Sequence, residues 1–352
     1  MFFNQHQGRR SDHGFSLVEI MIGVIIGMLG IVIIMKVFLV SEGQKRTTTG
    51  GADAVENGLM ALFTMEQDIR MSGLGMVGLG CTLINTYDAN ATPTTPAPKP
   101  FWPATITRDS PAAGSDQVAI LYSASPFGNI PTTITVAMPP TSAIFNVLNG
   151  DGFVQGDIFV ISQPPLNCSR AQASQDGQRT GSTWNLEHNS GVGFPLNPSG
   201  GANIFPAGGY TAGARITNMG RMVDHTYFVQ GANLMLRDNN ALIVPGTNPL
   251  PIVNGIVAIR AQYGRDTNGD GFVDIYDNNP TSPISATDVI SVKLAVVARS
   301  GQQERENVSP DPVILWSGGT LGNGGALSLN RTYRYKVYQT IIPLRNIVWN
   351  TP

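Results

Sequence analysis

Three patterns follow one another at the N-terminus of this chain. Residues 1–14 are polar and carry Arg9 and Arg10, whereas residues 15–40 are almost wholly apolar. A helix of that length would extend about 39 Å at 1.5 Å per residue, more than the roughly 30 Å hydrocarbon core of a bilayer. The pattern therefore predicts a membrane-spanning helix over 15–40, with the arginines holding the short leader on the cytoplasmic side.

A helical period returns after Gly50-Gly51. Apolar residues recur there at spacings of three and four, as on one face of an amphipathic helix: Val55, Leu59, Leu62, Met65 and Ile69. The pattern ends at the glycine-rich segment Ser72-Gly73-Leu74-Gly75, which is a common C-terminal signal. We therefore expect residues 41–75 to continue the helix and to lay this face against a sheet.

Much of residues 76–352 shows the two-residue period of β-strands, interrupted by segments rich in turn residues. The strand candidates are 117–123, 131–138, 157–162, 224–230, 233–237, 257–263, 290–298, 313–316 and 333–341. Gly231-Ala232 predicts a tight turn between two of them. Segments 86–115 and 169–215 lack a clear period and are expected to be loops, to which no function is assigned. The pattern predicts an α+β fold, with a long helix packed on an antiparallel β-sheet-rich body.

The candidate at 290–298 has the sharpest alternation. Its apolar face comprises Ile290, Val292, Leu294, Val296 and Ala298. Ser291 and Lys293 belong to its other face, and the same period recurs near the C-terminus around Tyr335 and Val337. Both segments are predicted to be half-buried antiparallel strands with one face toward solvent.

Composition narrows the class of protein. Charged residues make up 13 % of the chain and the formal net charge is −2, so no basic excess points to a nucleic-acid partner. Gly (40) and Pro (24) are dispersed through a chain that is 42 % apolar, which favours a globular body over disorder. The two cysteines, Cys81 and Cys168, predict one disulfide if the body is exported; two buried thiols are the alternative.

The start of the apolar run differs from an ordinary secretory signal. Such a signal is cut after its apolar run at small residues, but the small residue here, Gly14, precedes the run. Glu19 lies inside the run, where a carboxylate is costly and indicates a functional role. Cleavage after Gly14 would make Phe15 the N-terminus. The new ammonium of a neighbouring subunit could then pair with Glu19 and offset the desolvation of both charges.

The segment Gly14-Phe15-Ser16-Leu17-Val18-Glu19 resembles the class III signal of type IV prepilins. The resemblance implies that a prepilin peptidase removes residues 1–14 and that Phe15 becomes N-methylated. It also implies that residues 15–40 serve first as a membrane anchor and then as the packing core of a filament, with Glu19 pairing charges during assembly.

An acidic loop at 266–277 carries a second motif. Oxygen-bearing side chains occupy its positions 1, 3, 5, 9 and 12, a carbonyl is available at position 7, and Gly271 is at position 6. The candidate ligands are Asp266, Asn268, Asp270, Phe272, Asp274 and Asp277. This spacing is that of an EF-hand loop, in which Ca²⁺ takes six to eight oxygen ligands. Asp277 stands where a bidentate Glu is usual, and a strand-like pattern before the loop argues against a helix pair. We expect a Ca²⁺ site; a metal-free hairpin turn is the alternative.

Further segments resemble large minor pilins of the PilW type: IRMSGLG, GDIFVIS, YGRDTNGDGFVDIY, SVKLAVVARS and YQTIIPLRN. The resemblance covers 14–75 and 250–347 and is thin between them. It implies a type IV pilin-like fold and a structural subunit that helps to prime pilus assembly near the tip, in a filament used for twitching motility and cell adhesion.

The same resemblance implies partners and a location. The partners are other minor and major pilins, the prepilin peptidase and a tip adhesin. The location is the inner membrane of a Gram-negative bacterium, with residues 76–352 in the periplasm, and after assembly the pilus at the cell surface.

An enzyme is not expected. The sequence has no G-x-S-x-G elbow, H-E-x-x-H zinc motif or phosphate loop, and His188 and His225 are interpreted as structural histidines. Two alternatives to a minor pilin stay open: a pseudopilin of a type II secretion system and a signal-anchored exported enzyme. Glu19 argues against the tip pseudopilin, which typically lacks that acid. An anchored enzyme would need neither Gly14 nor Glu19.

Overall fold

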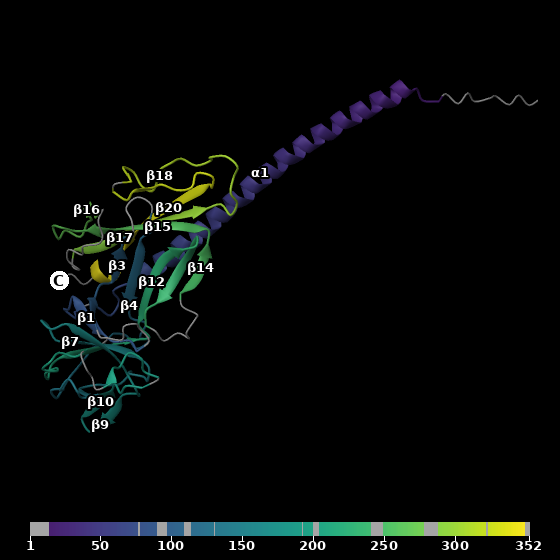
Figure 1. Ribbon diagram of the computed structural model, residues 1–352. Helices are drawn as coiled ribbons and strands as arrows, with labels where there is room; N and C mark the ends of the chain where they lie inside the picture. Colours follow the sequence, from purple (N-terminus) through teal and green to yellow (C-terminus); the bar gives the residue numbers. More distant parts are fainter. Residues whose placement is uncertain are drawn as a thin grey trace, which may run out of the picture. The chain divides into compact units, whose positions relative to one another are not determined.

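The computed structural model describes residues 14–76, 78–89, 97–108, 114–129, 131–191, 193–199, 204–240, 249–277, 288–321 and 323–348 (Figure 1). Contacts divide the chain into two compact units, Met1–Ala52 and Asp53–Pro352. Most of the predicted leader, residues 1–13, lies outside the described residues.

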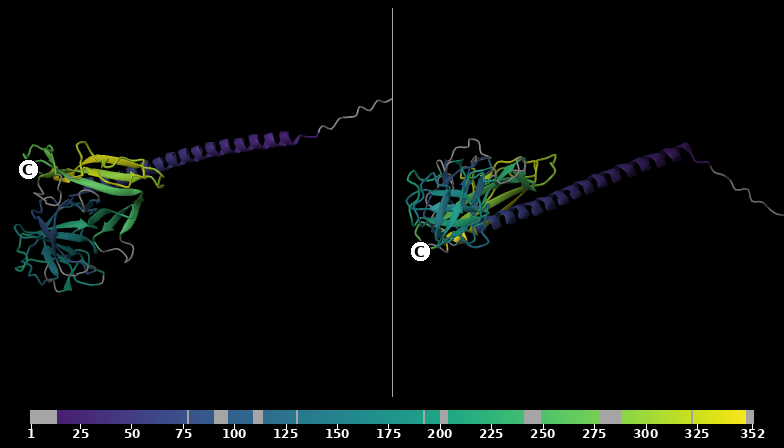
Figure 2. Two further views of the ribbon diagram at one scale, coloured as in Figure 1. Left: turned by 45° about the horizontal axis from the view of Figure 1, so that its top comes forward. Right: turned by 90° about the horizontal axis from the view of Figure 1, so that it is seen from below.

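One helix, α1 (Leu17–Met71), runs through the whole predicted helical region (Figures 1 and 2). Gly50 and Gly51 do not interrupt it. Its end at Met71 confirms the predicted stop, because Gly73 and Gly75 adopt the positive φ angles, 82° and 80°, that glycine tolerates best.

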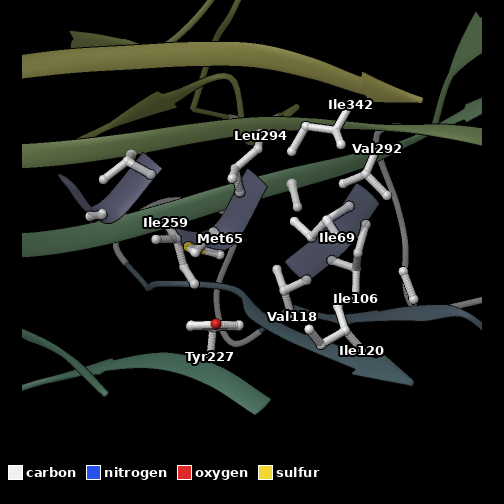
Figure 3. Close-up of a cluster of buried hydrophobic side chains, with 14 of the residues drawn as sticks. Met65, Ile69, Ile106, Val118, Ile120, Tyr227, Ile259, Val292, Leu294 and Ile342 are labelled. Atoms are coloured by element: carbon white, nitrogen blue, oxygen red, sulfur yellow. The ribbon is translucent and has the colours of Figure 1, made fainter. Parts of the chain in front are cut away.

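Residues 53–71 of α1 pack between two sheets of the body. The four-stranded sheet has the order β16-β15-β17-β20, with β15 (Ile256–Arg265), β16 (Ile275–Tyr276), β17 (Val289–Arg299) and β20 (Tyr335–Pro343). The five-stranded sheet has the order β14-β13-β12-β4-β3, with β3 (Ala104–Thr107), β4 (Gln117–Tyr122), β12 (Val223–Gln230), β13 (Asn233–Asp238) and β14 (Leu250–Asn254). Met65 and Ile69 of the helix enter a core shared with Val118, Ile259 and Leu294 (Figure 3).

A second core is built mostly from the segment between β4 and β12, and two earlier strands add to its larger sheet. Its six-stranded sheet, order β2-β1-β8-β7-β11-β5, contains β1 (Leu83–Thr86), β2 (Ala97–Pro100), β5 (Thr132–Thr133), β7 (Ile158–Ser162), β8 (Cys168–Gln172) and β11 (Arg215–Gly220). A three-stranded sheet, order β6-β10-β9, contains β6 (Ile144–Val147), β9 (Gln178–Thr180) and β10 (Thr183–Glu187). We call these two sheets the second lobe. Phe145, Phe159 and Leu186 are among its core residues, and the pairing of β1 with β8 is parallel.

A short strand pair and a short helix complete the C-terminal part. The strands β18 (Val313–Ile314) and β19 (Ala326–Leu327) form a pair, and α2 (Arg345–Val348) follows β20. The predicted tight turn at Gly231-Ala232 is confirmed, because it joins β12 to β13 with φ angles of 60° and 61°.

The buried face of α1 agrees with the predicted one at Met65 and Ile69 and differs from it nearer the N-terminus. Val55 and Leu59 are 38 % and 49 % exposed, whereas the buried residues are Ala54, Gly58, Ala61, Met65 and Ile69. A Cβ at Gly58 would overlap the Tyr338 ring and lie 3.2 Å from Ala298 Cβ. Small residues therefore face the sheet because its side chains approach the helix closely.

Four further predictions about strands and loops require correction. Only Thr132–Thr133 of the candidate 131–138 is a strand, and the predicted loop 169–215 contains the three-stranded sheet's β9 and β10 and most of β8. The strand β17 is covered on both faces rather than one, since Ala295 and Val297 pack with Leu315, Trp316 and Leu327. The predicted loop 86–115 likewise contains β2 and β3, while residues 90–96 and 109–113 lie outside the described residues.

Candidate assembly segment and acidic loop

The Gly14–Phe15 bond lies just before α1. Residues 14–16 are not helical, Phe15 is 79 % exposed, and the carbonyl of Ser16 accepts hydrogen bonds from the N–H groups of Glu19 and Ile20. The predicted cleavage point is thus in exposed, non-helical backbone, which a protease active site can bind in extended form.

Glu19 lies in the first turn of the helix. Its negative charge there complements the positive end of the helix dipole. The rest of this part of the helix presents an apolar surface. Every large apolar side chain from Phe15 to Val40 is more than half exposed. Among the described residues, α1 is the one helix long and apolar enough to cross a membrane.

A polar cluster fixes the second half of α1 to the five-stranded sheet. The Asp68 carboxylate accepts hydrogen bonds from the Tyr227 hydroxyl at 2.6 Å and the Tyr122 hydroxyl at 3.2 Å, and it lies 3.3 Å from His225 Nδ1. Burial raises the pKa of Asp68, but the hydrogen bonds with His225 and Tyr227 outweigh this and hold it below its usual value. This geometry fits the interpretation of His225 as a structural histidine. The sequence analysis did not single out Asp68, although an acid next to the buried face of a helix could have indicated this polar cluster.

The acidic loop joins β15 to β16, so strands and not helices flank it. One oxygen of Asp266 accepts the N–H groups of Asn268, Gly269 and Asp270, and its other oxygen accepts that of Gly271 at 2.7 Å. Desolvation raises the pKa of Asp266, while these donors, led by Gly271 and Gly269, lower it below its usual value. The N-terminal half of the loop is therefore wound around one carboxylate.

Asn268 contacts two further predicted ligands, Asp270 and Asp274. Its Nδ2 donates to Asp270 Oδ2 and to Asp274 Oδ1, both at 3.2 Å. The amide nitrogen thus supplies the positive partial charge that a cation would supply between these carboxylates. Asp277 follows β16 and its N–H donates to the Tyr263 carbonyl. In the described part of the chain, no group of three or more His, Cys, Asp or Glu side chains is gathered in a way that would hold a metal ion.

Two known families match this chain, one near its N-terminus and one toward its C-terminus. Residues 226–346 match the model of the family described as Type IV Pilus-assembly protein W, or PilW, and residues 9–35 match that of the Prokaryotic N-terminal methylation motif. The chain is PilW-like and carries a prepilin-type signal. A search of curated proteins and a search of solved structures gave no significant match.

The two matches support a type IV pilus-related pilin. PilW proteins are structural components of the pilus rather than enzymes, and such a protein interacts with other pilus components. The prepilin signal and the apolar helix that follows it indicate membrane anchoring and pilus assembly. The PilW-like region runs from β12 through β20 and contains the acidic loop.

The second lobe lies almost wholly outside the PilW-like region. It contains one cysteine of the predicted disulfide, which the structure confirms: Cys81 is bonded to Cys168 of this lobe, with their Cα atoms 5.8 Å apart. His188 is also in this lobe, buried against the rings of Phe145 and Phe205. Burial lowers the pKa of His188 to about 4, so it is a neutral core residue near pH 7.

Proposed function

We propose that this chain is a minor pilin-type structural subunit of the type IV pilus that helps to prime assembly and lies near the tip. The observation that carries the proposal is the junction of a prepilin signal with an apolar helix whose side chains from Phe15 to Val40 are more than half exposed. Such a surface needs a bilayer before assembly and neighbouring helices afterwards.

The second half of the helix supports the same conclusion. Val55, Leu59, Met60 and Phe63 are 38–61 % exposed although their helix is packed on a sheet. The helix thus has one face buried in its own body and a second apolar face left for a neighbour. Other minor and major pilins are the partners that such a face would contact.

A place near the tip is supported by the extent of the PilW-like region. The second lobe lies outside that region, yet it has its own core. If a subunit is repeated along a fibre, an added lobe must fit against the neighbouring subunits at every repeat. A subunit at the end of the fibre has fewer neighbours and can carry such a lobe more easily. A tip adhesin and the prepilin peptidase are further proposed partners, and the proposed location is the inner membrane and then the pilus of a Gram-negative bacterium.

Processing is tested by mass spectrometry of the N-terminal peptide from protein made in its own host. We expect a peptide that begins at N-methylated Phe15. The variant Gly14→Ala should retain residues 1–14, because the peptidase subsite admits little beyond glycine. A mature protein that still begins at Met1 would reduce the chain to a signal-anchored exported protein and reopen the question of an enzyme.

Charge pairing is tested by Glu19→Ala, with Glu56→Ala, an exposed acid of the same helix, as the control. Glu19→Ala should insert into the membrane and be processed, but it should fail to enter pili, whereas Glu56→Ala should assemble. Normal pilus incorporation of Glu19→Ala would refute the pairing. A strain lacking this protein that keeps its pili but loses secretion of exported proteins would instead support a type II pseudopilin.

For the acidic loop, we propose Ca²⁺ held by Asp266, Asn268, Asp270, the Phe272 carbonyl and Asp274, with Asp277 as the sixth candidate. The donors fit a hard cation, because all are oxygens and Gly271, with a φ of 84°, makes the required turn. Asp266→Ala with Asp270→Ala should lower the melting temperature in Ca²⁺ and leave it unchanged in chelator. An equal loss in both buffers would show a folding defect and no metal site.

A further inference from the structure

A pocket of about 520 Å³ lies in the second lobe, and every residue that lines it precedes the PilW-like region. Its volume is in the range of small-molecule sites, roughly 300–1,000 Å³. Fourteen described residues line it, from segments 127–128, 131–132, 149–154 and 176–177, together with Trp184 of β10 and Asn218 of β11. It shares no lining residue with the helix or the acidic loop.

Two aromatic residues and two glycines shape the pocket. A Cβ at Gly150 would lie 2.9 Å from Trp184 Cβ and 3.3 Å from Trp184 Cε3, and a Cβ at Gly152 would lie 3.3 Å from Phe127 Cβ and Cγ. The absence of side chains at both positions lets the two aromatic residues pack directly on the loop backbone. Asp151 stands between the two glycines, so a carboxylate is presented by the stretch of loop that the aromatic residues contact.

The charges in the pocket are all negative. Its lining contains Asp151 and Asp176 and, among the described residues, no Lys, Arg or His. One oxygen of Asp176 accepts the Gln155 N–H at 2.8 Å, and the Asp151 carboxylate accepts no hydrogen bond from the described part of the chain. The pocket therefore offers hydrogen-bond acceptors and negative charge, and the matching ligand carries donors and positive charge.

We propose that this pocket binds an organic cation, a primary or quaternary ammonium group on an apolar stem. The ammonium is attracted to the faces of the Phe127 and Trp184 rings, as cations are in aromatic cages. Asp151 and Asp176 neutralise its charge, and the rings cover its carbon substituents. An anion does not fit this pocket, because carboxylates and the faces of aromatic rings both repel negative charge.

A hexapeptide that occurs twice in the chain shows how the pocket differs from a site for an inorganic cation. Residues 149–154 and 268–273 both read Asn-Gly-Asp-Gly-Phe-Val. In both copies the Asn side chain accepts the N–H of the Asp two residues later at 2.9 Å. The acidic loop has Asp266 two residues before its copy, whereas the pocket loop has Val147, a buried residue of β6. The pocket loop lacks the carboxylate around which the acidic loop is wound, and it has aromatic neighbours in its place.

The test is calorimetric titration of the full chain in detergent micelles with choline, Nα-acetyl-lysine methylamide, glucose and CaCl₂. We expect choline or the lysine amide to bind in a saturable way at millimolar concentration, more weakly as salt rises. Binding of choline alone identifies a quaternary ammonium, and binding of the lysine amide alone identifies a primary one. Saturable binding at this pocket of glucose or Ca²⁺ only, or of none of the four, overturns the proposal.

The repeat supplies matched variants. Asp151→Asn and Phe127→Ala should each weaken binding about three- to fivefold, the size of one exposed ion-pair or cation–π contact. Asp270→Asn, at the same place of the other hexapeptide, and Leu148→Ala, which is 62 % exposed and outside the lining, should bind choline and the lysine amide as the parent does, whatever Asp270→Asn does to Ca²⁺ binding. Equal weakening in these controls would show that the cation does not bind here. Melting curves of all four variants check that they are folded, and pilus assembly is expected to be unaffected.

Discussion

At the scale of single residues, a buried ion pair anchors the segment before β4 to the four-stranded sheet. The Asp116 carboxylate lies 2.7 Å from Arg260 Nη1 and accepts the N–H of Ala261 at 2.9 Å, and the side chains of Asp116 and Arg260 are both fully buried. Arg108 Nε lies 3.3 Å from the same carboxylate. Two cations and one backbone donor thus share one acid.

Asp116→Ala should lower the free energy of unfolding by about 3–5 kcal/mol, because it leaves the buried Arg260 charge without its carboxylate. Guanidinium denaturation of the full chain in detergent, followed by tryptophan fluorescence, measures this. Glu306→Ala, an exposed acid, is the control and should change the value by less than about 0.5 kcal/mol. Similar values for the two variants would mean that the pair adds no net stability.

His188 predicts a pH dependence of stability. Its pKa in the folded protein is about 4, below the ordinary value of 6.5, because burial against Phe145 and Phe205 disfavours the charged ring. The unfolded chain therefore binds a proton first as the pH falls, and stability contributed by His188 is present above pH 6.5 and lost between pH 6.5 and 4.

The loss attached to this one group is up to about 3 kcal/mol. His188→Phe, which keeps the aromatic contact, should flatten the stability profile over that range. Denaturation midpoints at a series of pH values test it. A profile that keeps its slope in His188→Phe would assign the pH dependence to other groups.

At the scale of elements, the contact between α1 and the sheet depends on small residues. Gly58→Leu should destabilise the protein by about 1–3 kcal/mol, since its side chain would be forced against Tyr338 and Ala298. Gly51→Leu is the matched control, because a Cβ there has no atom within 4 Å and leucine favours the helix. Denaturation of both variants gives the comparison, and equal stability would show that the sheet yields to the larger residue.

The elements that could be predicted from the sequence are those whose periodicity results from burial of apolar side chains. The helix, its end at Met71 and the central strands β15 and β17 are of this kind. The first half of the buried face of α1 was misassigned because Ala54, Gly58 and Ala61 rank low in hydrophobicity, although only small residues fit there. The pattern followed the larger Val55 and Leu59, which face outward.

The strand β8 could not be predicted, for a different reason. It is buried along its whole length, yet it reads Cys-Ser-Arg-Ala-Gln. Its polar residues are held by distant partners: Ser169 accepts the Tyr210 hydroxyl at 2.8 Å, Arg170 donates to Asn240 at 2.9 Å, and the backbone N–H of Gln172 donates to Asn197 Oδ1 at 2.8 Å. Partners 25 to 70 residues away leave no local signal. The prepilin signal, by contrast, is contiguous and needed no tertiary knowledge.

At the scale of the whole body, one covalent bond ties the residues after α1 to the second lobe. Cys81 follows the helix end, Cys168 begins β8, and the two enclose a sequence separation of 87 residues. Around them Met76, Leu79 and Ile84 form a small core. The body therefore reaches its full stability only in a compartment that allows disulfides to form, which agrees with export across the membrane.

Replacing both cysteines by serine should lower the free energy of unfolding by roughly 3–5 kcal/mol in the chain-entropy account of a loop this long. Adding reductant to the parent should cause the same loss, and adding it to the double variant should cause none. Because the PilW-like strands have a separate core with α1, limited proteolysis of the variant should cut first within the second lobe, while β15, β17 and β20 stay protected. Uniform digestion would mean that the two cores unfold as one unit, and that the disulfide supports the whole body.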